Sequence, residues 1–436
     1  MLFNHNKLKA VIEWGFIISG LVFLFLSDRY SGGDSALRID AVRSFINEGR
    51  ILNIKYSLLM PIFSIPVYFI GSLFGKEELF LNQFNYIILV ITLILSYRLL
   101  KEFFQVETLR IFIILVIYAS MFTHHIEFFY GELFSACLLF LGVILILKEK
   151  NTYGCILLAL AAGNQPGIFL GMFLFCVFIG LSKKKFNSFL APFLALLLIL
   201  AENYLKYGNI FITGYENDHG FKTIMPYSSL PGFSYPFFFG LISILFSFGK
   251  GLLWFTTGIF IPWSWYSDGL NVKSHLFLKS LLIIVVGIIL FYSKWWSWYG
   301  GYFWGPRYFL FASFPASLIL ASAASGNKSS ILKPLVIICV LILSFWVGLN
   351  GVIIGQRNLE FVTKNNYALE FLIWYVPEFS VLWKPFIDGL TLDVIDKIQL
   401  IFSLSVLLWC IKRFISNLFG FLLPTSISKS KTNPEL

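Results

Sequence analysis

The sequence has 436 residues, of which 58% are hydrophobic and only 13% are charged, and its formal net charge is +10. Soluble domains carry about 25% charged residues, so the composition excludes a soluble protein and predicts a polytopic membrane protein. The lysines and arginines are scattered among apolar segments rather than gathered on one domain. Orientation in the membrane therefore explains the positive charge, and we expect no nucleic-acid partner.

The first apolar run, residues 10–26, follows Lys7 and Lys9 as the core of a signal peptide would. It ends in "FLFLSDRY", without the small-residue pattern of a cleavage site. We therefore interpret it as a retained signal anchor and as the first membrane span.

Further apolar runs predict an all-α, multi-pass protein of the cytoplasmic membrane, with about twelve transmembrane helices and both termini inside. Residues 1–436 should form one transmembrane domain, with no separate soluble domain. This threading places the basic clusters in the cytoplasm, as the charge rule requires: 98–110, 148–150, 183–185, Lys328, Lys333 and the tail from Lys412. The predicted spans are 10–26, 79–97, 111–126, 132–147, 152–163, 167–181, 187–204, 247–264, 275–292, 308–323, 334–350 and 398–414.

One apolar piece, residues 57–74, contains Pro61 and Pro66, which would interrupt a regular spanning helix. We interpret it as a re-entrant or surface segment, because every later basic cluster would change sides if it crossed. The external face then carries three loops, which are 27–56 (27–78 with this segment), 205–246 and 351–397.

The five cysteines all lie within apolar runs and show neither paired metal spacing nor an external cluster. Buried free thiols are expected, rather than a disulfide framework or a zinc site. These residues are Cys137, Cys155, Cys176, Cys339 and Cys410.

The first external loop carries an unusual density of charge around "GGDSALRIDAVRSFINEGR", residues 32–50. Apolar residues recur there at helical spacing, which predicts a short amphipathic helix on the membrane surface. Asp34 stands at or beside its N-cap, and Asp40 follows further along. Aspartate at a helix start is often only a cap, although a cap also fixes a carboxylate and keeps it ionised.

A second stretch, "KWWSWYGGYFWGPRYF" at 294–309, stands at the external end of a span and begins with Lys294. Its glycines permit a tight bend or the close approach of a ligand. Arg307 and Tyr308 follow at membrane depth. Arg307 could be an interfacial anchor among aromatic residues, or a bidentate partner of a lipid phosphate.

Two further stretches place charge at span mouths. In "HHIEFFYGELF", 124–134, Glu132 follows His124 and His125. An acidic group so near the hydrocarbon is expected to have a charged partner or a functional role. In "FGKGLLWF", 248–255, Lys250 takes a similar position. The two charges could also simply pair with each other.

The order of these motifs resembles bacterial members of the GT-C superfamily. These are integral-membrane glycosyltransferases that use polyprenyl-phosphate sugars, related to the protein O-mannosyltransferases and the lipid A aminoarabinose transferase. Their first loop reads like "GDE..YL..A.SLL.DG", matched here by "GDSALRIDAVRSFINEG"; "KYSLLMPIFSIP", Glu132, "GKGLLWF" and "GGYFWGPRY" follow in order. Two departures stand out: Ser35 replaces a frequent second acidic residue, and only 351–397 stands where many relatives have a periplasmic domain.

The resemblance implies an inverting transfer of a sugar from a polyprenyl-phosphate donor to a glycan, lipid or protein hydroxyl at the outer face of the membrane. Asp34 would take the acceptor proton, and Arg307 would bind the donor phosphate. Because the first loop holds no "DxD" signature, no obligatory metal or other cofactor is expected. The remaining candidates are Lys250, Lys294 and Tyr308 at the phosphate, and Glu132, Asp40, Lys55, His124 and His125 elsewhere in the site.

Two other classes of function stay open. A lipid-linked glycan flippase or transporter would carry out no chemistry; it would place ionisable residues in mid-span and would usually show repeated halves. An O-antigen polymerase or ligase would also work at the outer face, but with a polyprenyl diphosphate glycan. The gathering of charge at one face favours the transferase.

Overall fold

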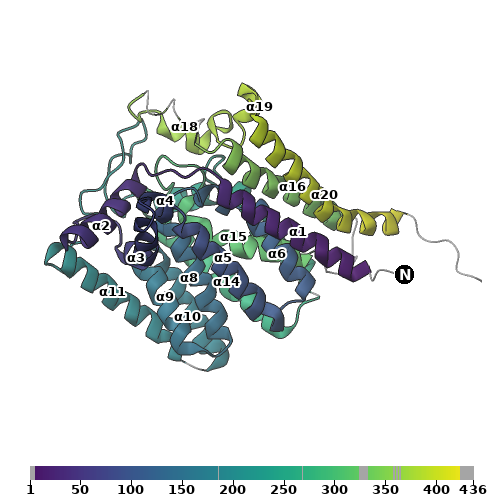
Figure 1. The fold of residues 1–436 in the computed structure, drawn as a ribbon, viewed down its shortest axis with the longest axis horizontal. Coiled ribbons are helices and arrows are strands. Elements are labelled where there is room, and N and C mark those ends of the chain that lie inside the picture. The colour runs from purple at the N-terminus through teal and green to yellow at the C-terminus, as the bar shows by residue number, and fades with distance from the viewer. Residues whose placement is uncertain are drawn as a thin grey trace, which may run out of the picture.

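The computed structural model describes residues 5–422, apart from 185, 268, 324–331, 357–358, 360–361 and 363–364. The described part is all-helical (Figure 1) and contains no β-strand, only an isolated bridge between Tyr30 and Phe128. The fold class expected from composition is therefore confirmed.

The helices of the first half run from the N-terminus to the start of a long loop at residue 208. They are α1 (His5–Leu26), α2 (Asp34–Glu48), α3 (Leu59–Ser72), α4 (Glu77–Asn82), α5 (Phe84–Leu99), α6 (Val106–Tyr118), α7 (Phe122–His125), α8 (Gly131–Leu147), α9 (Asn151–Asn164), α10 (Phe169–Lys183) and α11 (Leu190–Tyr207).

The second half contains both long helices and a series of very short ones. They are α12 (Phe237–Phe246), α13 (Leu252–Phe255), α14 (Val272–Tyr292), α15 (Ser313–Ala323), α16 (Leu332–Ile353), α18 (Glu370–Tyr375), α19 (Pro385–Asp388) and α20 (Val394–Leu422), with 3₁₀ turns η4 (Thr257–Phe260), η5 (Trp263–Trp265) and η6 (Arg307–Ala312) between them.

Seven helices in the described part are long and apolar enough to cross a membrane, and each coincides with a predicted span. They are Lys7–Leu26, Glu77–Glu102, Pro166–Lys183, Asn187–Tyr207, Val272–Tyr292, Leu332–Ile353 and Val394–Lys412. Shorter apolar helices, among them α8 and the η6–α15 unit, occupy further predicted spans. These central helices are buried along nearly their whole length, which explains why their apolar residues show no amphipathic stripe.

The predicted regular span at 247–264 is wrong. The apolar helix α12 ends at Phe246, inside the stretch expected as an external loop, and the following residues form only α13, η4 and η5. Gly249, Gly251 and Gly258 weaken a helix here, and Pro262 limits its end. The irregular backbone is covered by α15 and α16, which is where such backbone is tolerated in a membrane protein.

The segment 57–74 forms α3, a 14-residue helix that continues through Pro66, so the expected break at proline is absent. It packs against α2 and α4 (Figure 1). At about 1.5 Å per residue, α3 spans about 21 Å, which is shorter than the roughly 30 Å hydrocarbon core. Its re-entrant or surface position stays a prediction.

Several predicted cytoplasmic clusters meet at one end of the molecule. Lys148 pairs with Glu102, and the Lys183 ammonium donates to the Leu147 carbonyl over 3.4 Å. Asn271, at the start of α14, donates to the Phe103 carbonyl over 3.3 Å. The α2 and α18 helices lie away from this end (Figure 1). Which end faces the cytoplasm stays a prediction. Lys185 and Lys328 lie outside the described residues.

Four of the five cysteines are buried, as expected, whereas Cys339 is exposed, contrary to the expectation.

Candidate functional site

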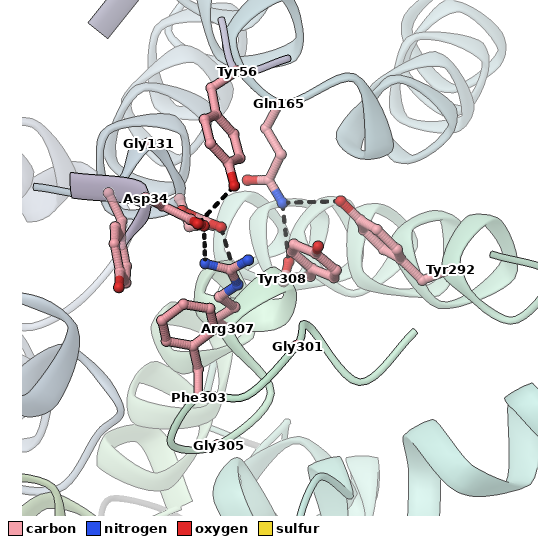
Figure 2. A network of polar contacts seen from close by, with 12 residues as sticks. Asp34, Tyr56, Gly131, Gln165, Tyr292, Gly301, Phe303, Gly305, Arg307 and Tyr308 are labelled. Atoms are coloured by element: carbon pink, nitrogen blue, oxygen red, sulfur yellow. Dashed lines mark hydrogen bonds and ion pairs between the residues drawn. The ribbon is translucent and has the colours of Figure 1, made fainter. Parts of the chain in front are cut away.

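Asp34 and Arg307 form an ion pair between two motifs that the sequence analysis singled out separately. Asp34 Oδ2 lies 2.7 Å from Arg307 Nη1, and the Tyr56 hydroxyl donates to Asp34 Oδ1 over 2.6 Å (Figure 2). Both side chains of the ion pair are largely buried. The α2 start, the loop before α3 and the loop before α15 therefore converge on one carboxylate.

The carboxylate of Asp34 does not cap its own helix. Gly33 occupies the N-cap position, with φ of 59°, and no side chain makes a cap hydrogen bond there. Asp34 is the first residue of α2, where the helix dipole favours a negative charge. The neighbouring Ser35 hydroxyl accepts a hydrogen bond from the Phe129 amide over 3.1 Å, which ties α2 to the chain before α8. The side chain of Asp34 is thus free to serve the site.

Arg307 follows a loop of residues 300–306, which we call the glycine loop. Three glycines in it, Gly300, Gly301 and Gly305, have positive φ, which other residues adopt only with strain. The guanidinium lies 4.0 Å from the centre of the Phe303 ring, and its Nε lies 3.5 Å from Glu132 Oε1. Arg307 therefore bridges the carboxylates of Asp34 and Glu132.

The electrostatics keep Asp34 ionised. Burial alone raises the pKa of this carboxyl, but the charges of Arg307 and Arg38 and the hydrogen bonds from Tyr56 and Arg307 outweigh burial and hold the pKa below its ordinary value. Burial and the adjacent Asp34 charge raise the pKa of Tyr56, so this phenol remains a hydrogen-bond donor. The site holds a carboxylate at neutral pH.

A cavity of about 290 Å³ opens beside this ion pair. Tyr56 and Arg307 line it, whereas Asp34 itself is not part of its wall. The wall combines cations with aromatic and amide side chains, which include Arg38, Lys55, Lys206, Glu132, Glu202, Asn164, Gln165, Tyr215, Tyr292, Trp295 and Tyr308. Such a mixture suits a ligand with an anionic group and a polar ring.

The two cavity lysines are each paired with a carboxylate. Lys55 Nζ lies 2.9 Å from Asp218 Oδ2, which belongs to the 208–236 loop. Lys206 Nζ lies 3.0 Å from Glu202 and donates to the Tyr56 carbonyl over 3.2 Å. Lys55 is half-exposed and Lys206 is buried, so Lys55 is the more accessible cation.

Tyr308 also lines the cavity, as a member of an aromatic pair. Its ring stacks on Tyr292, with 4.5 Å between the ring centres. Gln165 Nε2 donates to the Tyr292 hydroxyl over 3.3 Å and to the Tyr308 carbonyl over 3.4 Å (Figure 2). These contacts fix a flat, polar-edged wall next to Arg307.

The other predicted lysines lie elsewhere. Lys250 is buried, and its ammonium donates to the carbonyls of Gly301, Phe303 and Gly305 over 3.2, 2.5 and 3.0 Å. Lys294 is exposed. Neither belongs to the cavity wall.

Asp40 and the two histidines are also separate from the cavity. Asp40 is exposed on α2, 3.7 Å from Arg43. His124 and His125 are buried, and their rings pack 5.0 and 6.0 Å from Trp304 in the glycine loop. His124 Nδ1 lies 2.9 Å from the Gly351 carbonyl. Both histidine rings thus pack against the glycine loop through Trp304.

In the described part of the chain no group of three or more His, Cys, Asp or Glu side chains is placed to hold a metal ion.

Sequence reasoning did not single out several residues that the structure brings to the site. Tyr56 follows Lys55 in the quoted "KYSLLMPIFSIP" stretch, and Arg38 lies between the apolar positions of the predicted amphipathic helix, so both had a local signal. Arg38 lies over the Tyr56 ring, 4.3 Å from its centre. Lys206 and Asp218 carried no local signal, because only the fold brings Lys206 to the cavity and Asp218 to the cavity residue Lys55.

Comparison with known proteins gives one informative result. No protein-family profile matches the chain, and no curated protein matches it by sequence. The solved structure of ArnT from Cupriavidus metallidurans bound to undecaprenyl phosphate matches with a TM-score of 0.54 and 12% identity, over 98% of this chain and 81% of ArnT. ArnT is a GT-C lipid A aminoarabinose transferase. The chain therefore has a polytopic, all-helical fold similar to that of ArnT.

Proposed function

We propose that the protein is an inverting glycosyltransferase that moves a sugar from a polyprenyl-phosphate donor to a hydroxyl of a glycan, lipid or protein at the outer face of the cytoplasmic membrane. The observation that carries the proposal is the Asp34–Arg307 ion pair at a cavity with further cations on its wall. The GT-C-like fold supports it, as does the polyprenyl phosphate bound by ArnT.

In the proposed reaction the acceptor oxygen attacks the anomeric carbon while the bond from that carbon to the phosphate oxygen breaks. The electron pair of that bond leaves with polyprenyl phosphate, and the acceptor proton passes to the Asp34 carboxylate. Attack from the side opposite the leaving group inverts the configuration. Arg307 balances the negative charge that grows on the leaving oxygen.

Donor binding also activates the base. Arg307 contacts Asp34 before the donor arrives, and an ion-paired carboxylate is a weak proton acceptor. The donor phosphate competes with Asp34 for the same guanidinium. As Arg307 turns to the phosphate, Asp34 loses a stabilising charge and its basicity rises. The Asp34 carboxylate thus becomes a stronger proton acceptor once the donor is bound.

For the donor phosphate we favour the cations on the cavity wall. Arg307, Arg38 and Lys55 border the cavity, whereas Lys250 and Lys294 do not. Lys55 offers an accessible ammonium once Asp218 is displaced from it. Three cations around one phosphate provide the charge neutralisation that a phosphate leaving group requires.

The sugar would lie against the aromatic part of the wall, where Tyr292, Tyr308 and Trp295 stand near the amide of Gln165. Glu132 Oε2 is buried and makes no hydrogen bond to the described residues, so it can accept one from a sugar hydroxyl. These groups recognise a polar ring through stacking and hydrogen bonds.

The isoprenoid chain of the donor would lie in a second, apolar cavity of about 160 Å³ between α2, α3 and α11. Leu58 and Leu59 border it, directly after the cavity residues Tyr56 and Ser57, and Glu202 lines both cavities. The outer residues Phe45, Ile62 and Leu205 are exposed apolar side chains. In this proposal the apolar cavity would lead from the phosphate cations toward the lipid.

The test is a transfer assay with the purified protein in nanodiscs, a panel of polyprenyl-phosphate sugars and a membrane extract that supplies acceptors. We expect transfer from at least one monophosphate donor, with release of polyprenyl phosphate, and loss of transfer in Asp34→Asn. Transfer only from a polyprenyl diphosphate glycan would instead identify a polymerase or ligase. Movement of the lipid between leaflets without transfer would identify a flippase.

A further inference from the structure

The lysine of the "GKG" motif is buried in a place that the proposed reaction does not explain. Lys250 is 2% exposed and lies in the turn between α12 and α13. Its ammonium is within hydrogen-bond distance of three backbone carbonyls, of Gly301, Phe303 and Gly305. An ammonium has three N–H donors, so the three carbonyls satisfy it fully.

The carbonyls that meet Lys250 come from alternate residues of the glycine loop and turn to one side of it. Residues 300–306 form only bends and irregular backbone, and of the three carbonyls that of Gly301 also accepts a hydrogen bond from the Phe303 amide over 2.9 Å. The ammonium gives each of the three carbonyls a charged donor, so it stabilises this particular shape of the loop. Three carbonyls of the glycine loop thus converge on the Lys250 ammonium.

Glycines on both sides let Lys250 reach this position. A Cβ on Gly249 would stand 1.7 Å from the Ile373 carbonyl oxygen, and a Cβ on Gly251 would stand 2.4 Å from the Ser247 carbonyl oxygen. The Gly249 amide donates to the Trp374 carbonyl over 3.0 Å. The motif therefore needs glycine at both flanking positions so that its backbone can pack against α18 and its own turn.

The shape of the glycine loop decides where Arg307 points. The guanidinium rests on the ring of Phe303, a residue whose carbonyl meets Lys250. A Cβ on Gly300 would stand 3.0 Å from Arg307 Cγ, so the backbone of the loop lies directly against the arginine side chain. A change in the course of the loop must therefore move Arg307 relative to Asp34.

We infer that Lys250 is a positioning residue, which holds the glycine loop through its three carbonyls and thereby places Arg307 for the donor phosphate. The expected effect of Lys250 on sugar transfer rests on the proposed function. Its role in holding the glycine loop does not depend on that function. Lys250 does not touch the substrate in this arrangement. Its removal should affect the site only through Arg307.

The loop contact is tested without any substrate. In Lys250→Met the side chain keeps its length but loses its charge and its donors. Hydrogen exchange of the donor-free protein, followed by mass spectrometry, should show amides of residues 300–306 exchanging at least about tenfold faster than in the wild type. Lys222→Met, which changes an exposed lysine in the 208–236 loop, is the matched control and should leave this exchange unchanged. Lys250→Arg keeps charge and donors and should restore most of the protection.

Action through Arg307 is tested by a double-mutant cycle on the single-turnover rate. Lys250→Met should slow transfer at least about tenfold, and adding it to Arg307→Ala should cause no further loss. Unchanged exchange in Lys250→Met, equal damage in Lys250→Arg, or losses that multiply in the double variant would each overturn the inference. A raised donor KM with unchanged exchange would make Lys250 a direct ligand instead. If the wild type transfers no sugar, the proposed function fails while the exchange experiment still decides the role in the loop.

Discussion

The carboxylate of Asp34 and the guanidinium of Arg307 lie 2.7 Å apart, although 273 positions separate them in the chain. This contact joins the first external loop to the glycine loop before α15. In the proposed reaction it would place the proton acceptor next to the group that binds the donor phosphate.

Asp34→Asn should lower turnover on the order of 10² to 10⁴-fold, because the amide cannot accept the acceptor proton. Binding of the donor lipid should persist, since the phosphate cations remain. Single-turnover rates and donor affinity in nanodiscs measure the two effects separately. Near-normal turnover would remove Asp34 from the catalytic role and make Glu132, on the cavity wall beside Arg307, the next candidate.

Arg307→Ala should raise the donor KM and lower kcat together, because the guanidinium meets the phosphate both before and during bond breakage. Arg307→Lys keeps the charge but loses the planar, two-pronged geometry, and should leave a weak enzyme. Thermal stability in detergent is the necessary control, because the change also removes the buried partner of Asp34. A folded Arg307→Ala protein with unchanged affinity and rate would place the phosphate elsewhere.

Lys55 and Asp218 should give opposite results although they form one ion pair. Lys55→Met removes a cavity cation and should weaken donor affinity by about tenfold, a free-energy change of about 1.4 kcal/mol. Asp218→Asn frees Lys55 from its partner and should strengthen donor binding. Equilibrium titration with polyprenyl phosphate measures both. Parallel weakening in the two variants would mean that the pair only supports the 208–236 loop.

The lowered pKa of Asp34 predicts a dependence of stability on acidity. A carboxyl whose pKa is lower in the folded protein than the ordinary 3.8 contributes stability above that value, and the contribution is lost as pH falls through the folded pKa. The wild type should therefore lose Tm below about pH 4 more steeply than Asp34→Asn does. Melting curves of both proteins between pH 6 and pH 3 provide the comparison. Parallel curves would show that Asp34 is not held by Arg307 in solution.

Filling the apolar cavity should discriminate between donors by the length of their lipid chain. Ala201 lines this cavity on α11, and Ala201→Trp should raise the KM of a long-chain polyprenyl-phosphate donor by about tenfold or more. A donor analogue with a methyl group in place of the isoprenoid chain should be used as well as by the wild type. Leu197→Trp, one turn earlier on α11 and outside the cavity, is the control. Equal effects on both donors would place the isoprenoid chain elsewhere.

The sequence by itself determined the membrane class, the all-helical fold and the positions of the seven long apolar helices. The reason is physical: in a bilayer each spanning helix must satisfy its own backbone hydrogen bonds, so the length and apolarity that it needs can be recognised from its own residues. The start of α2 at Asp34 and the bend before Arg307 were equally local, because glycine and the amphipathic spacing mark them. The predicted span at 247–264 failed because the same apolar composition also suits irregular backbone that other helices cover.

Only the tertiary structure decided which of the charged residues meet. Apolarity places a lysine or arginine at a span mouth, but it does not set the direction in which the side chain points. Lys250 turns inward to the carbonyls of the glycine loop, whereas Lys55 turns to the cavity. Lys206 reaches the cavity through the packing of α11, and Asp218 reaches the cavity residue Lys55 through the course of the 208–236 loop. Both placements depend on contacts between distant segments. Such contacts carry no local signal, since each is the outcome of how all the helices pack together.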